Sequence, residues 1–86
     1  MERKEYPLEG QTVVFTGKFK RMERMHLLDL AERLGARVMS SVSKRTAFVV
    51  IGEEYAVEKL ERARQLDIPV FSEEDFFANI ADYIEE

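Results

Sequence analysis

The chain has 86 residues, a hydrophobic fraction of 45% and a formal net charge of −4, which fits one globular domain near the lower size limit for unassisted folding. It has no cysteine, which excludes a disulfide framework, a thiolate nucleophile and a thiolate metal site. No apolar run approaches the roughly 20 residues of a membrane span, and the charged start MERKEY does not fit a signal peptide, so we expect an intracellular protein and no membrane partner.

We expect an N-terminal tether at residues 1–7 and a domain at residues 8–86. The first half of the chain predicts a strand, a helix and a second strand. The run QTVVFTG is β-branched and aromatic and ends in glycine, which predicts a strand at about residues 12–16. Its apolar residues are consecutive, as in a parallel-sheet strand covered on both faces. Residues 24–34 follow a helical period, and Gly35 is suited to end this helix. ARVMS then predicts a brief strand and SVSKR a polar turn.

The second half predicts a strand, a helix, a strand and a final helix. TAFVVIG is a second consecutive apolar run, a helix follows at about residues 55–66, and DIPVF predicts a short strand. Ser72 begins a helix-start pattern with acids in the first turn. The order β-α-β-β-α-β-α indicates a mostly parallel sheet with helices on both faces, in which ligands bind beyond the carboxyl ends of the strands. The apolar stripe of the last helix comprises Phe76, Phe77, Ile80 and Ile84.

The sequence contains no pattern of catalytic groups. His26 is the only histidine, and it lies on the polar side of the first helix, where a solvated side chain is expected. No serine or threonine has an evident base partner, and no glycine-rich nucleotide motif occurs. The contiguous acids at residues 73–75 open a helix, where they complement its dipole. We therefore expect no catalytic residue, no cofactor and no metal.

Anion binding has more support. Residues 1–46 carry ten Lys and Arg against six Asp and Glu, whereas residues 47–86 carry three against eleven, so their net charges are +4 and −8. This split allows a local anion-binding face, and it equally fits two solvated surfaces of opposite sign. Thr16 offers a hydroxyl, Gly17 lets a ligand approach the backbone amides, and Arg24 opens a helix whose N-terminus attracts anions. The alternative is a plain strand exit followed by a solvated arginine.

Lys59 is a further candidate cation on the second helix. On a helical wheel it lies closer to the buried stripe than its charged neighbours do. Such a lysine either extends its ammonium group to solvent along the apolar surface or reaches over the strand ends toward Thr16. The residue pattern alone leaves both possibilities open.

With these motifs in place, the chain resembles a BRCT domain from about Leu8 to Ile84. The resemblance lies in LEGQTVVFTG, in LAERLGARVMSSVSKRTAFVVIG and in KLERARQLDIPVFSEEDFF, and it is greatest for the variety found in bacterial NAD-dependent DNA ligases and in the large subunit of replication factor C. It implies a three-layer α/β/α fold with a four-stranded parallel sheet, the first and third helices on one face and the second on the other. Many members have a tryptophan in the last helix, where this chain has Phe76 or Phe77.

The resemblance also implies a phosphate pocket. The Thr-Gly pair after the first strand matches Thr16 and Gly17, the arginine that starts the first helix matches Arg24, and the lysine of the second helix matches Lys59. Phosphopeptide readers of this family generally use two tandem copies. Only one copy fits in this chain, which argues against sequence-selective phosphopeptide recognition.

The leading hypothesis is a non-catalytic module that binds DNA where a 5′-phosphate is exposed, within a DNA ligase or a replication or repair factor. The alternative is a phosphopeptide or protein-interaction module, whose partner is a phosphoprotein or another domain of the parent enzyme. Such a module is expected in the cytoplasm if bacterial and in the nucleus if eukaryotic. The cations expected to contact neighbouring backbone phosphates without reading sequence are Lys18, Lys20, Arg21, Lys44 and Arg45.

Overall fold

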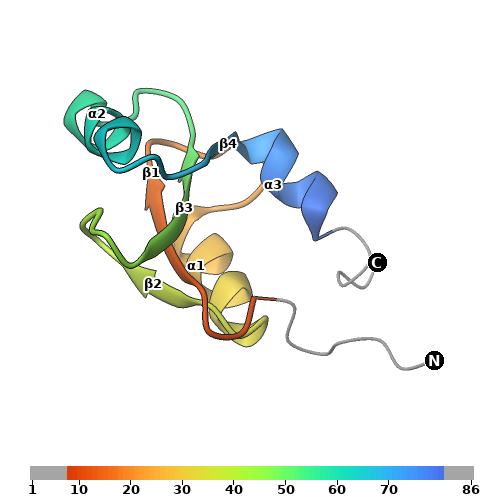
Figure 1. Ribbon diagram of the computed structural model, residues 1–86. Coiled ribbons are helices and arrows are strands. Elements are labelled where there is room, and N and C mark those ends of the chain that lie inside the picture. The colour runs from red at the N-terminus through yellow and green to blue at the C-terminus, as the bar shows by residue number, and fades with distance from the viewer. Residues whose placement is uncertain (1–7, 81–86) are drawn as a thin grey trace.

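A computed structural model of the chain describes residues 8–80 and confirms the predicted order of elements (Figure 1). The predicted tether at residues 1–7 and the predicted apolar position Ile84 lie outside the described residues. The elements are β1 (Thr12–Thr16), α1 (Arg24–Arg33), β2 (Arg37–Met39), β3 (Thr46–Ile51), α2 (Val57–Gln65), β4 (Val70–Ser72) and α3 (Glu73–Asn79).

The four strands form one parallel sheet in the order β2-β1-β3-β4, as Figure 1 shows. The pairing of β1 with β3 runs from Thr12 opposite Thr46 to Thr16 opposite Ile51. Because both strands run the same way, the loops that leave their carboxyl ends start side by side. These two loops lead into α1 and α2.

Helices cover both faces of the sheet, and a separate hydrophobic core lies between the sheet and the helices on each face. On one face Val13 and Phe15 of β1 pack in a cluster with residues of α1 and α3. On the other face Val14 packs with Ala63 of α2. The expected division of the helices, with α1 and α3 on one face and α2 on the other, is confirmed. All three of these β1 side chains are buried, as the consecutive apolar run predicted.

The ends of the helices follow local sequence signals. Gly35 adopts a φ of 100° directly after the C-cap residue of α1, as its position predicted. The Ser72 hydroxyl accepts a hydrogen bond from the Asp75 amide (3.1 Å) and so caps α3. Pro69 lies in the segment between α2 and β4, where the missing amide hydrogen is tolerated.

The predicted start of the fourth strand, at residue 67, is wrong. Asp67 has a φ of 57°, which is a turn conformation, and the Ile68 amide donates to the Ala63 carbonyl to close α2. The residues from Asp67 to Pro69 therefore end the helix, and pairing with β3 begins only at Val70. No helix between residues 8 and 80 is long and apolar enough to cross a bilayer.

Candidate phosphate and nucleic-acid interface

The end of β1 places Thr16 and Gly17 at the carboxyl edge of the sheet. Thr16 is 4% exposed, and its hydroxyl oxygen accepts a hydrogen bond from the Ala56 amide at 3.0 Å. Its hydroxyl hydrogen remains available as a donor. Gly17 has a φ of 101°, and a Cβ atom there would lie 2.8 Å from the Glu53 carbonyl oxygen. Glycine is therefore required by both conformation and space.

Arg24 folds back onto the same strand end. Its Nη2 atom donates to the Phe15 carbonyl at 3.0 Å, and its Nη1 atom lies 3.5 Å from the Gly17 carbonyl. These contacts hold the guanidinium group at the end of β1, on the carbonyls of the two residues that flank Thr16. A guanidinium has five N–H donors, so most of them remain free for an anion.

The N-termini of α1 and α2 both lack a side-chain cap. Neither Glu23 before α1 nor Ala56 before α2 accepts a hydrogen bond from its helix through a side chain, in contrast to Ser72 before α3. The first turn of α1 also contains no acidic residue. Uncapped amides and the helix dipole attract anions at such ends. The N-terminus of α1 therefore favours negative charge at this edge, whereas the first turn of α2 contains Glu58.

Lys59 lies in the first turn of α2 and is partly buried. Its amide is 3.1 Å from the Ala56 carbonyl, and the Ala56 amide binds Thr16, so the backbone around Lys59 is tied to the end of β1. The side chain lines a hollow of about 440 Å³ together with the β2–β3 turn, and the lining of that hollow does not include Thr16, Gly17 or Arg24. The convergence of the Lys59 ammonium group on Thr16 stays a prediction.

Two of the predicted DNA-backbone cations carry partners on the loop after β3. Lys18 Nζ is 2.9 Å from a Glu54 carboxylate oxygen, and Lys20 Nζ is 2.8 Å from a Glu53 carboxylate oxygen. All four side chains are largely exposed. The hydrogen bond and charge of Glu53 raise the pKa of Lys20 above its ordinary value of 10.5, so this lysine is charged at neutral pH.

A side chain at the start of α3 binds the backbone of the β1–α1 loop. The Glu73 carboxylate accepts hydrogen bonds from the Lys20 amide (3.0 Å) and from the Arg21 amide (2.6 Å). The Arg21 guanidinium lies over the Phe77 ring, 4.6 Å from its centre. Phe19, in the same loop, packs edge-on against Phe15 and is partly buried against the core.

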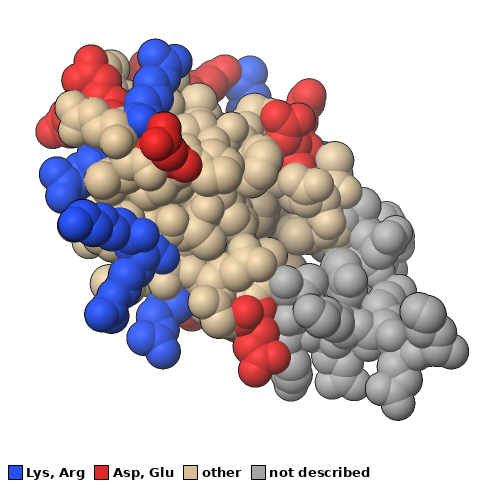
Figure 2. All heavy atoms as spheres, in the orientation of Figure 1, with Lys and Arg blue, Asp and Glu red and all other residues tan. Residues whose placement is uncertain are grey.

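Lys44 and Arg45 lie at the opposite edge of the sheet from Thr16, where the amino ends of the strands are. They directly precede Thr46, which pairs with Thr12 at the start of β1. Both are exposed, and Figure 2 shows Lys and Arg side chains gathered over β2 and the turn that follows it. The turn is anchored to α2, because Arg62 Nε donates to the Val42 carbonyl at 3.0 Å. The predicted cations therefore form two groups rather than one.

Sequence reasoning did not find the partners of the β1–α1 loop, which are Glu53, Glu54 and Glu73. A signal for the first two was present: lysines follow a glycine after β1, and glutamates follow a glycine after β3. In a parallel sheet these two exits are neighbours. No comparable local signal pointed to Glu73.

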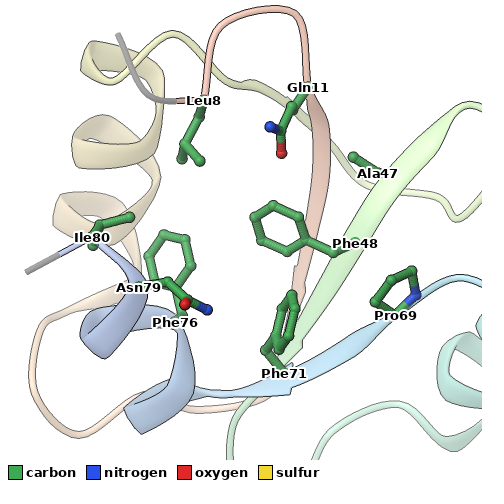
Figure 3. A pocket seen from close by; sticks show the side chains of 9 residues that line it. All are labelled: Leu8, Gln11, Ala47, Phe48, Pro69, Phe71, Phe76, Asn79 and Ile80. Atoms are coloured by element: carbon green, nitrogen blue, oxygen red, sulfur yellow. The ribbon is translucent and has the colours of Figure 1, made fainter. Parts of the chain in front are cut away.

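An apolar hollow of about 410 Å³ lies on another part of the surface (Figure 3). Phe48, Phe71 and Phe76 converge on it, and Gln11 and Asn79 supply the polar groups at its rim. None of the described residues that line it is charged, and such a lining is unsuited to binding phosphate. The described residues also hold no group of three or more metal-ligating side chains, and His26 is exposed.

The fold and the chain's sequence point to one family. Residues 3–80 match the BRCA1 C Terminus (BRCT) domain. The chain belongs to the BRCT family. It is similar to DNA ligases. It is 50% identical over 80 residues to a DNA ligase of Syntrophotalea carbinolica and 46% identical over 77 residues to a DNA ligase of Stenotrophomonas maltophilia.

These matches cover most of this BRCT chain but little of each ligase. They include 93% of the chain and 12% of the Syntrophotalea carbinolica protein, and 90% of the chain and 9% of the Stenotrophomonas maltophilia protein. A DNA ligase of Symbiobacterium thermophilum is 46% identical over 72 residues, with 84% of the chain and 10% of the ligase covered. The chain thus spans about a tenth of the length of the relatives it matches.

Proposed function

We propose that this BRCT domain is a non-catalytic module of a DNA ligase, or of another replication or repair factor, and that it binds DNA where a 5′-phosphate is exposed at an end or nick. The observation that carries the proposal is the Arg24 guanidinium held at the end of β1 by the carbonyls of Phe15 and Gly17. The similarity to DNA ligases supports DNA as the ligand.

Each proposed contact supplies a different kind of donor to the terminal phosphate. The Thr16 hydroxyl and the uncapped amides of α1 give neutral hydrogen bonds, and Arg24 gives charge-assisted ones. Lys59 completes the set as a second cation from a separate helix. A terminal phosphate monoester carries more charge than a phosphate within the strand, which favours the end over the interior.

The remaining cations contribute sequence-independent affinity. Contacts to backbone phosphates orient a duplex but carry no base information. The proposed cations are Lys18, Lys20, Arg21, Lys44 and Arg45, and the effect of those that no carboxylate of the protein neutralises is expected to weaken with salt.

The test compares duplexes that carry either a 5′-phosphate or a 5′-hydroxyl group. Arg24→Ala should lower affinity for the phosphorylated duplex by about 10- to 100-fold, because a hydrogen bond to a charged group contributes about 1.5–3 kcal/mol. Arg33→Ala is the matched control, since it removes the same charge from the far end of α1, where Arg33 pairs with Asp29. Fluorescence anisotropy titrations measure both.

Two results would contradict the proposal. One is equal affinity of the unmodified protein for the two duplexes, and the other is an equal loss in both variants. Binding of a phosphoserine peptide, lost in Arg24→Ala and stronger than that of the phosphorylated duplex, would instead indicate the phosphoprotein alternative.

A further inference from the structure

The loops that leave β1 and β3 are bonded to each other through their backbones. The Lys18 amide donates to the Glu53 carbonyl at 2.7 Å, and the Glu53 amide donates to the Lys18 carbonyl at 2.8 Å, which forms an isolated antiparallel bridge. The Gly52 amide also donates to the Thr16 carbonyl at 2.8 Å. The two segments are thus joined before any side chain contributes.

The side chains on this bridge have opposite charges. Lys18 pairs with Glu54 at 2.9 Å and Lys20 with Glu53 at 2.8 Å. Glu54 has a φ of 55°, a conformation uncommon for a residue with a side chain, so the backbone turns at the position that supplies one partner. The conformation of the backbone therefore places the Glu54 carboxylate close to Lys18.

This arrangement differs from an ordinary exposed ion pair. Such pairs contribute little, partly because two long side chains must lose conformational freedom to meet. Here the bridge already holds the two backbones together, so the local concentration of carboxylate around each lysine is high. A DNA phosphate that approaches Lys18 or Lys20 must displace a tethered carboxylate rather than a free salt ion.

We propose that Glu53 and Glu54 act as built-in counterions that restrain sequence-independent binding of DNA through Lys18 and Lys20. The inference rests on the proposed function, since it assumes that the ligand is DNA, but it concerns the duplex backbone rather than the terminal phosphate. A lysine that stays paired with its carboxylate neutralises little of a DNA phosphate's charge, so few of the counterions condensed on the DNA are released. Its contact therefore adds little to the salt dependence of affinity.

The test is the double variant Glu53→Gln/Glu54→Gln, titrated with a 5′-hydroxyl duplex at several salt concentrations. Freed lysines should raise affinity at low salt by about fivefold. They should also steepen the slope of log affinity against log salt by about 2, since each phosphate contact contributes about 0.9. Because the duplex has no terminal phosphate, the result does not depend on whether the protein recognises 5′-phosphate ends.

Glu9→Gln/Glu32→Gln is the matched control. It makes the same change in net charge at two exposed carboxylates, neither of which forms an ion pair within residues 8–80. An unchanged slope in Glu53→Gln/Glu54→Gln, or equal gains in the two double variants, would overturn the inference. If the unmodified protein binds the duplex too weakly to measure, measurable binding by Glu53→Gln/Glu54→Gln alone supports it and failure of both variants to bind overturns it.

Discussion

Gly17 is one of the residues of the proposed phosphate site and is constrained in two independent ways. Its φ of 101° is costly for any residue with a Cβ atom. A Cβ atom there would also lie 2.8 Å from the Glu53 carbonyl oxygen and 2.9 Å from the Gly52 carbonyl carbon. These neighbours are backbone atoms, so they cannot move aside as a flexible side chain would.

Gly17→Ala should therefore lower the free energy of unfolding by more than Gly10→Ala. Gly10 has a φ of 80° but no atom within 4 Å of an added Cβ, so this variant isolates the conformational cost of about 1–2 kcal/mol. The extra loss in Gly17→Ala measures the steric cost of separating the two loops. Urea denaturation gives both values. Equal losses would mean that the loops move apart freely.

The residues of the proposed phosphate site were easier to single out from the sequence than the ion pairs beside them. Thr16, Gly17 and Arg24 were found because they follow a recognisable strand and open a recognisable helix. The ion pairs of Lys18 and Lys20 were not predicted, since their partners come more than 30 residues later and meet them only through the pairing of β1 with β3. Long-range pairing of this kind leaves no local pattern.

At the level of elements, the start of α3 determines where the β1–α1 loop lies. Glu73 is the first residue of α3, and its carboxylate binds two consecutive amides of that loop. The Ser72 cap fixes the start of the helix, and the burial of Phe76 and Phe77 fixes the face that α3 presents to the sheet. The loop that carries the proposed phosphate contacts is thus held from outside as well as from its own ends.

Glu73→Ala should accelerate hydrogen exchange at the Lys20 and Arg21 amides by about 10- to 100-fold, because hydrogen bonds to a charged group are worth about 1.5–3 kcal/mol. Glu74→Ala is the control, since it removes a neighbouring exposed carboxylate from the same helix turn. Amide exchange followed by NMR measures the effect. Similar rates in the two variants would show that the loop is held by other contacts.

The elements themselves were predicted in the correct order because apolar periodicity and glycine positions mark them independently of tertiary contacts. The stripes of α1 and α3 are buried as expected, at Leu27, Ala31 and Phe76 for example. The strand boundary at residue 67 was wrong because the apolar residues of DIPVF fit a strand and the end of a helix equally well. Only the turn at Asp67 distinguishes a strand from a helix end here. Aspartate tolerates this turn conformation, but its presence in a sequence does not predict one.

On the scale of the whole molecule, the predicted cations divide between the two edges of the sheet. Lys44 and Arg45 lie near the start of β1, whereas Lys18 and Lys20 lie beyond its end, and β1 itself spans about 13 Å. The first pair has no carboxylate partner within residues 8–80, whereas the second pair does. A duplex that contacts both groups must extend along the strands.

Lys44→Ala/Arg45→Ala should therefore reduce the salt slope by about 2 and leave the preference for a 5′-phosphate unchanged. The reason is that these cations are exposed and distant from Thr16. Titrations of both duplexes at several salt concentrations test this, with Arg33→Ala as a variant whose slope should not change. A lost preference for the phosphorylated duplex would place Lys44 or Arg45 in the phosphate pocket itself.

The burial of β1 in both cores has a mechanical consequence. Val13 and Phe15 anchor the strand in one layer and Val14 anchors it in the other, while hydrogen bonds join it to β2 and β3 on its two sides. Tension applied through a ligand at Thr16 would pass directly into this strand and be shared by every layer of the domain. In the proposed complex with DNA, the end of β1 would therefore be a firm point of attachment for the nucleic acid.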